Sequence, residues 1–240
     1  MPQLTGQISL FPYDFAPVDW TNCDGRILPI FQNQRLFNLI GFTFGGDHQS
    51  SFAVPDLTAV APKNCRYCLS LIDSRSSLDR YEGVLGETFA LPTKSQAASN
   101  LVACEGQSFT AADYDSLAMY MGDRFGGDGV DLKLPDLKGK PLATDYRYVI
   151  CVEGNDPVYQ GPREPFIGQL ILLPFDEAVQ SLLRCDGGMV SVQQNTALYG
   201  VIGNRFGGDA QKFGLPGVSS AVPTNYNYFI SRNGLTPHRP

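Results

Sequence analysis

The residues best suited to chemistry form a short glycine turn that occurs three times. Gly45-Gly46-Asp47 recurs as Gly126-Gly127-Asp128 and as Gly207-Gly208-Asp209. Two adjacent glycines allow the backbone to present N–H groups to an anion, and an aspartate can bind a cation or a sugar hydroxyl. The alternative is a tight turn whose aspartate caps nearby backbone N–H groups, which explains why all three copies retain it. We therefore expect these nine residues to be mainly structural, with ligand contact as a secondary role.

Residues for nucleophilic or acid-base catalysis are sparse. The two histidines, His48 and His238, are 190 residues apart, so a Ser-His-Asp or Cys-His arrangement is hard to assemble. No phosphate-binding loop or nucleophile elbow is present. Asp24 and Asp47 offer the carboxylate pair of a polysaccharide hydrolase, but the pair recurs as Glu105 and Asp128, which turns explain better. The sequence predicts no enzyme and no cofactor.

The six cysteines favour packing over chemistry. Cys23, Cys104 and Cys185 share one repeated position beside a turn, where we interpret them as small buried hydrophobic residues. Cys65 and Cys68 form a single C-x-x-C that lacks the second pair a tetrahedral zinc site needs. A strand with incidental cysteines is favoured over a redox or metal site.

These motifs keep one register along the whole chain. Cys23-Asp24-Gly25 recurs as Cys104-Glu105-Gly106 and Cys185-Asp186-Gly187 at intervals of 81, and the glycine turn follows the same interval. Two motifs with one period indicate a repeat protein. We divide the 240 residues into repeats at 1–82, 83–164 and 165–240, which are called units 1, 2 and 3 below.

The segments between the units have the composition of linkers. Residues 73–84 and 153–165 are turn-rich, and the tail from Arg232 to Pro240 is expected to be frayed.

Each unit is predicted to contain the same elements. An apolar strand (7–11, 88–91 or 169–173) opens it, and an aromatic strand containing Tyr67, Tyr148 or Tyr228 closes it. A short strand (51–54, 131–134 or 212–215) follows each glycine turn.

One short helix is predicted in each unit. Apolar residues at i, i+3 and i+4 give it one apolar face, and a glycine ends it. The helix residues are Leu36, Leu39 and Ile40; Leu117, Tyr120 and Met121; and Leu198, Val201 and Ile202, followed by Gly41, Gly122 and Gly203. Thr110 and Asp113 have the spacing of a capping box.

Aromatic residues are assigned to the core. Trp20 has aliphatic counterparts in the other units. Tyr13, Phe15, Tyr226 and Tyr228 offer sugar-stacking surfaces, but aromatic residues near strands belong more often to the core.

The fold class follows from these elements. An 80-residue unit with few strands and one helix has a thin core, so the units must pack against one another. We expect an α+β protein of three tandem, small, β-rich repeats, each with one short helix, packed with pseudo-threefold symmetry.

Composition excludes several partners. The chain is 43% hydrophobic with a net charge of −6 and no basic run, so nucleic acid is not an expected partner. No apolar stretch has the length of a membrane span, and residues 1–10 lack a signal-peptide pattern. The net charges of the three units are −2, −5 and +1, so a pseudo-symmetric body would present three different faces.

The first unit resembles a known domain. Ordered motifs between Gly6 and Leu57, including Cys23-Asp24-Gly25, Gln32-Asn33-Gln34 and Phe44-Gly45-Gly46-Asp47, are similar to the phage tail collar domain, which also occurs in microcystin-dependent proteins. Unit 3 resembles it next best, and unit 2 retains the Phe125 to Asp128 and Leu134 to Leu137 segments.

The resemblance implies a non-enzymatic structural or adhesive part of a phage tail, a phage-derived contractile injection system or a related surface fibre. The implied partners are other tail, fibre or filament proteins, and the implied location is a virion tail or surface particle made in the bacterial cytoplasm. A typical member has one collar domain on a trimeric fibre, whereas this chain has three and no shaft sequence. We therefore expect a tip, cap or plug in which one chain replaces a trimer, so that the protein is a monomer and not a homotrimer. The alternative is a lectin-like module that binds cell-surface glycans through its repeated Asp and aromatic positions.

Overall fold

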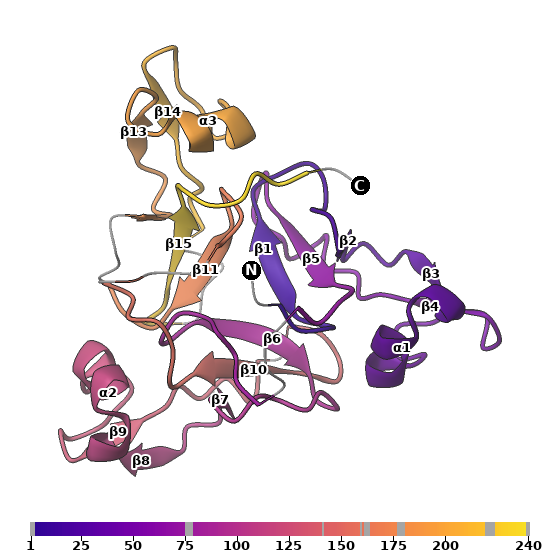
Figure 1. Cartoon of the computed structure of the whole chain (residues 1–240), viewed down its shortest axis with the longest axis horizontal. Coiled ribbons are helices and arrows are strands. Elements are labelled where there is room, and N and C mark those ends of the chain that lie inside the picture. Colours follow the sequence, from indigo (N-terminus) through magenta and orange to yellow (C-terminus); the bar gives the residue numbers. More distant parts are fainter. Residues whose placement is uncertain are drawn as a thin grey trace.

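The computed structural model describes residues 3–74, 79–140, 142–158, 160, 164–176, 181–218 and 224–238, and these form three similar units around a common centre (Figure 1). The expected fold class is confirmed, with short strands dominating and one α-helix in each unit. Parts of the predicted linkers, residues 75–78, 159 and 161–163, lie outside the described residues.

Each unit contributes one antiparallel three-stranded sheet to the centre. In every sheet the closing aromatic strand lies between the opening strand and a short third strand. The strands are β1 (Ile8–Phe11), β5 (Arg66–Ser70) and β2 (Trp20–Asn22) in unit 1; β6 (Thr88–Pro92), β10 (Tyr146–Cys151) and β7 (Leu101–Ala103) in unit 2; and β11 (Leu170–Leu173), β15 (Asn227–Ser231) and β12 (Leu182–Arg184) in unit 3.

An arm projects outward from each sheet, in three different directions (Figure 1). An arm is a two-stranded ribbon with a seven-residue helix. Arm 1 holds β3 (Ile27–Pro29), the 3-10 helix η1 (Ile30–Gln32), α1 (Gln34–Ile40) and β4 (Ser51–Ala53); arm 2 holds β8 (Ser108–Thr110), η2 (Ala111–Tyr114), α2 (Asp115–Met121) and β9 (Asp131–Lys133); arm 3 holds β13 (Met189–Ser191), α3 (Thr196–Ile202) and β14 (Lys212–Gly214). None of the described helices has the length and apolar character needed to cross a membrane.

The helix prediction is confirmed in its apolar face and in its end. Leu36 and Ile40 of α1 are buried, as are the matching pairs of α2 and α3. Each helix stops at its glycine, which has φ of +55° at all three positions. A positive φ is readily adopted only by glycine, so the residue type fixes the end of the helix.

The capping-box prediction is wrong. Thr110 precedes the 3-10 helix η2 and makes no side-chain cap hydrogen bond, and α2 starts only after Tyr114. The 3-10 turn takes the place of the first helical turn, so the Thr110 and Asp113 spacing does not meet the geometry that a reciprocal cap requires.

The three opening strands close a ring at the centre. Ile8 pairs with Ala90, Thr88 pairs with Leu172, and Leu170 pairs with Leu10. In every pair, the residue four positions before the proline that follows the strand in one unit meets the residue two positions before that proline in the next unit. The contact is therefore head to tail and closes after three units, as in a cyclic trimer.

The hydrophobic core does not divide along the unit boundaries. One buried cluster joins Leu69 of unit 1 and Leu198 of unit 3 with Ala90 of unit 2. A second joins Leu117 of unit 2 with Phe229 of unit 3. The predicted boundaries of the units remain predictions, since burial is shared across them.

A further set of contacts ties each arm to the next unit. Arg124 binds Asp176 at 2.7 Å, and its carbonyl oxygen accepts a hydrogen bond from Asn225. In the same way, Arg205 forms an ion pair with Asp14 at 3.7 Å, and its carbonyl oxygen accepts a hydrogen bond from Asn64. At the remaining interface Thr43 donates a hydrogen bond to Asp145. The same geometry is thus repeated around the ring with different side chains.

The C-terminal tail is not frayed through its described part, which corrects the sequence expectation. The Leu235 N–H donates to the Pro165 carbonyl oxygen at 2.8 Å, and the Val18 N–H donates to that of His238 at 3.1 Å. The tail therefore runs from unit 3 onto unit 1. It is held by backbone hydrogen bonds, which side-chain patterns in the sequence do not predict.

A glycine at the start of each opening strand allows the units to approach closely. Gly6, Gly86 and Gly168 have positive φ, and a Cβ on each would press against a ring of the neighbouring unit: Pro92, Phe175 and Tyr13 respectively. These positions need glycine both for backbone conformation and for space.

We predict that Gly168→Ala destabilises the fold more than Gly129→Ala. Both glycines have φ of +86°, but a Cβ at Gly168 would lie 2.8 Å from Tyr13 Cε1, whereas the space around Gly129 is open. The backbone cost of about 1–2 kcal/mol applies to both, and the collision adds about 1–3 kcal/mol at Gly168. Chemical denaturation measures both changes, and equal losses would contradict a packing role for the glycine.

A buried polar residue follows each of these glycines. Gln7, Glu87 and Gln169 are buried, and each accepts a hydrogen bond from the backbone N–H three residues earlier. Two copies use a neutral amide, whereas the middle copy uses a carboxyl group. Burial raises the pKa of Glu87 to about 7, against the lowering effect of its hydrogen bonds with the Val84 N–H and Tyr81.

We predict that Glu87→Gln stabilises the protein at alkaline pH. The folded protein binds the Glu87 proton more tightly than the unfolded chain, so the contribution of Glu87 to stability is fully present below about pH 4.5 and is lost as the pH rises through about 7. The loss is about 3 kcal/mol, and glutamine, which carries no charge, avoids it. The free energy of unfolding should therefore rise at pH 8.5 and change little at pH 4.5. The exposed Glu105→Gln serves as control, and a gain independent of pH would refute the explanation.

Candidate functional site

The glycine turn lies between the helix and the second ribbon strand of each arm. In arm 1 the Gly45 N–H donates to the Phe42 carbonyl oxygen, and Gly46 has φ of +133°. A Cβ at Gly46 would lie 2.4 Å from the Ser51 carbonyl oxygen, so no larger residue fits. The second glycine is therefore required for the chain to pass its own returning strand.

The aspartate of each turn accepts hydrogen bonds from the loop that follows it. The Asp47 carboxylate accepts backbone N–H groups of Gln49, Ser50 and Ser51 at 2.8–2.9 Å and the Ser50 hydroxyl at 2.7 Å. Asp128 and Asp209 each accept two backbone N–H groups at equivalent places.

These hydrogen bonds stabilise the ionised aspartates. The Ser50 hydroxyl and three backbone N–H groups hold the pKa of the Asp47 carboxyl well below its usual range. Backbone N–H groups lower the pKa of Asp128 and of Asp209 in the same way. The carboxylates are directed at their own loops, and the three turns lie on three separate arms, so they do not form one site (Figure 1).

The other candidate catalytic residues predicted from the sequence do not form a shared site either. Asp24 binds Arg26 through two hydrogen bonds of 2.7 and 2.8 Å, which lowers its pKa, so Asp24 and Asp47 each have their own partners. His48 is exposed on the turn with its ring centroid 4.5 Å from that of Phe42.

The cysteines are free thiols, and most are buried. Cys23, Cys104 and Cys185 lie in the core, and burial raises the pKa of all three. Burial likewise raises the pKa of Cys65 and of Cys68 to about 12, so few reactive thiolates form near neutral pH. Among the described residues no group of three or more His, Cys, Asp or Glu is placed to hold a metal ion.

The aromatic candidates belong to the core or its margin. Trp20, Tyr13 and Tyr226 are at most 4% exposed, and Phe15 and Tyr228 are partly buried. Tyr13 uses its hydroxyl to bind the Ile167 carbonyl oxygen of unit 3. Its role is therefore to join units, and no open stacking platform is formed at these positions.

A polar groove that no sequence motif predicted lies between units 1 and 2. Its walls are the segment at Leu4 and Thr5, helix α1, Asp73, and Ser95 with Gln96 of unit 2. No motif marks these residues, but an alignment of the three repeats would have shown that Thr5 stands where the other copies have Leu85 and Ile167.

Comparison with known proteins gives one family. The model of the phage tail collar domain matches residues 6–62, 86–142 and 168–223, one segment inside each unit. Neither curated proteins nor solved structures gave a match. The matched segments cover well over half of the chain, which belongs to the phage tail collar domain family.

We predict that Asp47→Ala lowers the melting temperature by about 2–6 °C because it removes the acceptor of the turn. Asp209→Ala should cost less, since Asp209 accepts fewer hydrogen bonds. Asp47→Asn, which keeps one carboxamide oxygen, should lie between Asp47→Ala and the unchanged protein. Calorimetry at neutral pH tests this order, and a melting temperature unaffected by Asp47→Ala would leave the turn without a stabilising role.

Proposed function

We propose that this collar-family chain is a non-enzymatic tip, cap or plug of a phage tail or of a related contractile injection or fibre apparatus. The family is one of structural domains of phage tails, and that coarser assignment comes directly from the three matched segments. Its position within the particle and its replacement of a trimer are our inferences from the architecture.

The observation that carries the proposal is the closed ring of opening strands. A head-to-tail contact between identical units forms a ring of three chains, and here the same contact is completed within one chain. The surfaces that single collar units would offer to other chains are thus already occupied. The architecture favours a monomer that presents a threefold-like body to its partners.

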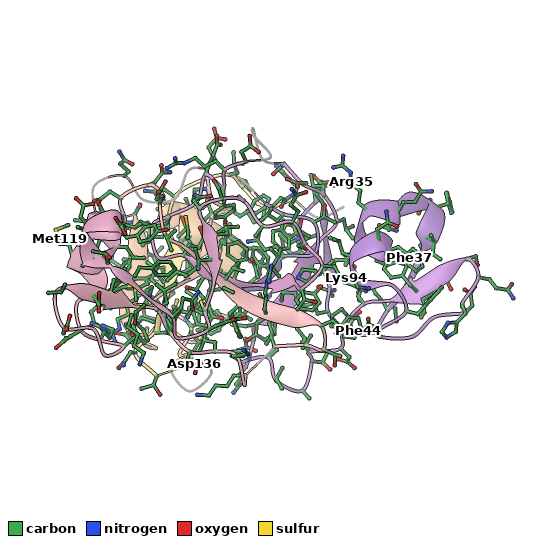
Figure 2. All side chains as sticks on the ribbon, turned by 90° about the horizontal axis from the view of Figure 1, so that it is seen from below. Arg35, Phe37, Phe44, Lys94, Met119 and Asp136 are labelled. Carbon is green, nitrogen blue, oxygen red and sulfur yellow. The ribbon has the colours of Figure 1, made fainter. Side chains whose placement is uncertain are left out.

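The arms supply different surfaces for docking to other tail proteins. Phe31 of arm 1 is 73% exposed and Ile27 is 57% exposed, whereas arm 2 exposes Met119 and Val130, and arm 3 exposes Met189. Figure 2 shows Met119 at the outer edge of the molecule. Aromatic residues and methionine are enriched in protein–protein interfaces. Three arms with one fold and different exposed side chains suit a component that meets several non-identical neighbours.

The oligomeric state provides the sharpest test. Light scattering after gel filtration should give about 26 kDa, the mass of one chain. A stable species of about 79 kDa, three times that mass, would contradict the replacement of a trimer by one chain.

Location is tested separately in the native source. Immunogold electron microscopy should place the label at the end of a tail or filament. Label spread through cell extracts with none on particles would contradict the structural role and would leave the one-chain architecture untouched.

A further inference from the structure

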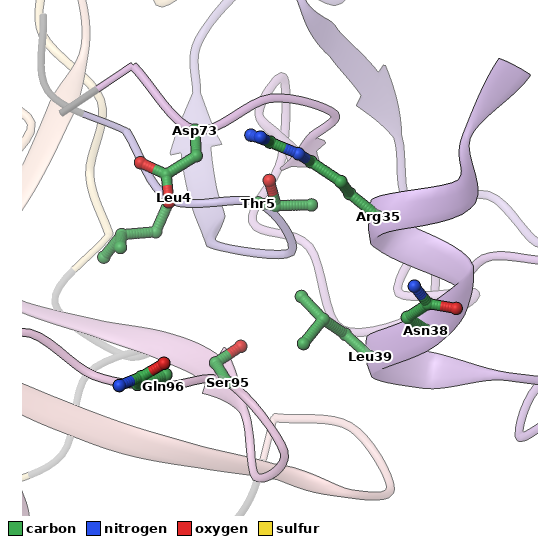
Figure 3. Close-up of a pocket in the computed structure, with 8 residues that line it drawn as sticks. All are labelled: Leu4, Thr5, Arg35, Asn38, Leu39, Asp73, Ser95 and Gln96. Carbon is green, nitrogen blue, oxygen red and sulfur yellow. The ribbon is translucent and has the colours of Figure 1, made fainter. Parts of the chain in front are cut away.

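The groove between units 1 and 2 has the composition of a binding site. It has a volume of about 260 Å³ and is lined by Leu4, Thr5, Arg35, Asn38, Leu39, Asp73, Ser95 and Gln96. Figure 3 shows that the lining residues come from the first segment, from α1, from the segment at Asp73 and from unit 2, and that Leu39 and Ser95 point into the space between these elements.

Two hydroxyl groups of the groove have no hydrogen-bond partner among the described residues. Thr5 is only 7% exposed, and neither its Oγ1 atom nor the buried Oγ atom of Ser95 forms a hydrogen bond with any described residue. Buried polar groups in folded proteins are almost always paired, so an unpaired hydroxyl indicates a missing partner. The groove thus contains hydrogen-bonding capacity that the fold itself does not use.

Pseudo-symmetry shows that this capacity is not needed for folding. The positions equivalent to Thr5 are Leu85 and Ile167, and those equivalent to Asn38 are Met119 and Gly200. Arg35 corresponds to Ser116 and Ala197, and Asp73 corresponds to Gly154 and Gly234. The same backbone is therefore built without these polar side chains in units 2 and 3.

Arg35 determines the charge of the ligand. The described residues offer it no ion pair, and in Figure 3 its guanidinium extends across the groove toward Thr5 and Asp73. A guanidinium binds a planar carboxylate through two parallel hydrogen bonds. The Asp73 carboxylate at the rim disfavours a ligand with several negative charges.

The remaining walls suit a small hydroxylated body. Thr5, Ser95, Asn38 and Gln96 provide hydroxyl and amide groups for ligand hydroxyls, while Leu4 and Leu39 provide an apolar wall. The volume lies just below the roughly 300–1,000 Å³ of sites for drug-sized ligands, which limits the ligand to about one ring.

We propose that the groove formed by Arg35, Thr5, Ser95 and their neighbours binds a carboxylate-bearing sugar unit of the hexuronate type. The carboxylate meets the Arg35 guanidinium, ring hydroxyls meet Thr5, Ser95 and the two amides, and the apolar edge of the ring faces Leu39. This site is separate from the repeated aspartates and aromatic residues. The equivalent groove of unit 2 has Leu85 and Ser116 where this one has Thr5 and Arg35, so this set of polar side chains is not repeated there.

Nuclear magnetic resonance titration of the full, isotope-labelled chain tests the site. Sodium glucuronate should shift the amide signals of Thr5, Asn38 and Ser95 saturably, and glucose, acetate and inorganic phosphate should each bind at least tenfold more weakly. No saturable shift, shifts centred elsewhere, or equally tight binding of acetate or phosphate would overturn the proposal.

Variants separate a specific contact from general attraction. Arg35→Ser, which introduces the residue type of unit 2, should raise the dissociation constant for glucuronate at least tenfold, and Thr5→Val should raise it about threefold. Lys94→Ser removes an exposed positive charge beside Ser95 that does not line the groove, and it should change binding less than twofold. Equal losses from Arg35→Ser and Lys94→Ser, with melting temperatures unchanged, would show non-specific electrostatics and refute the site.

Discussion

The pairing of β1, β6 and β11 is the constraint on which the rest of the molecule depends. Each opening strand provides one residue to the preceding unit and another to the next, so the orientation of one unit determines that of all three. Gly6, Gly86 and Gly168 leave room for the proline or aromatic side chain of the neighbouring unit, so that the units come close enough for this pairing. The arms, the arm-to-unit ion pairs and the shared core are all positioned by the ring, and no unit buries its apolar face alone.

Repetition makes much of this fold predictable from the sequence. The 81-residue period identifies three units, the i, i+3, i+4 pattern locates each helix, and Gly41 and its equivalents mark the helix ends, because these signals are local. The cyclic order of the strands and the return of the tail to Val18 depend on backbone hydrogen bonds between distant segments, to which side-chain patterns contribute little. The Thr110 prediction fails for a related reason, because a capping pair is informative only when the first turn is α-helical.

The candidate binding groove, in contrast to the fold, is not predictable from sequence motifs. The glycine turns are conspicuous in the sequence, and their aspartates accept hydrogen bonds from the loops that follow them. The groove at Thr5 and Arg35 has no motif, because its residues come from two units and four separate segments. The groove is recognised from a difference between repeats that share a backbone. Units 2 and 3 fold without the same polar residues at these positions, so the polar residues of unit 1 are not required for folding. Glu87 can be read in the same way, since Gln7 and Gln169 show that the position needs a hydrogen-bond acceptor and no charge.

The connectivity of the ring gives it a mechanical asymmetry. The chain runs through the junctions between units 1 and 2 and between units 2 and 3, but the junction between units 3 and 1 is closed by non-covalent contacts alone: the Leu10 and Leu170 pair, the hydroxyl of Tyr13 on Ile167, Arg205 with Asp14 and Asn64, and the tail on Val18. The molecule is therefore a split ring with a single seam. Tension that pulls the units apart will separate this seam first, because the chain itself connects the units at the other two junctions. The ring can therefore open and close again while all three units remain connected.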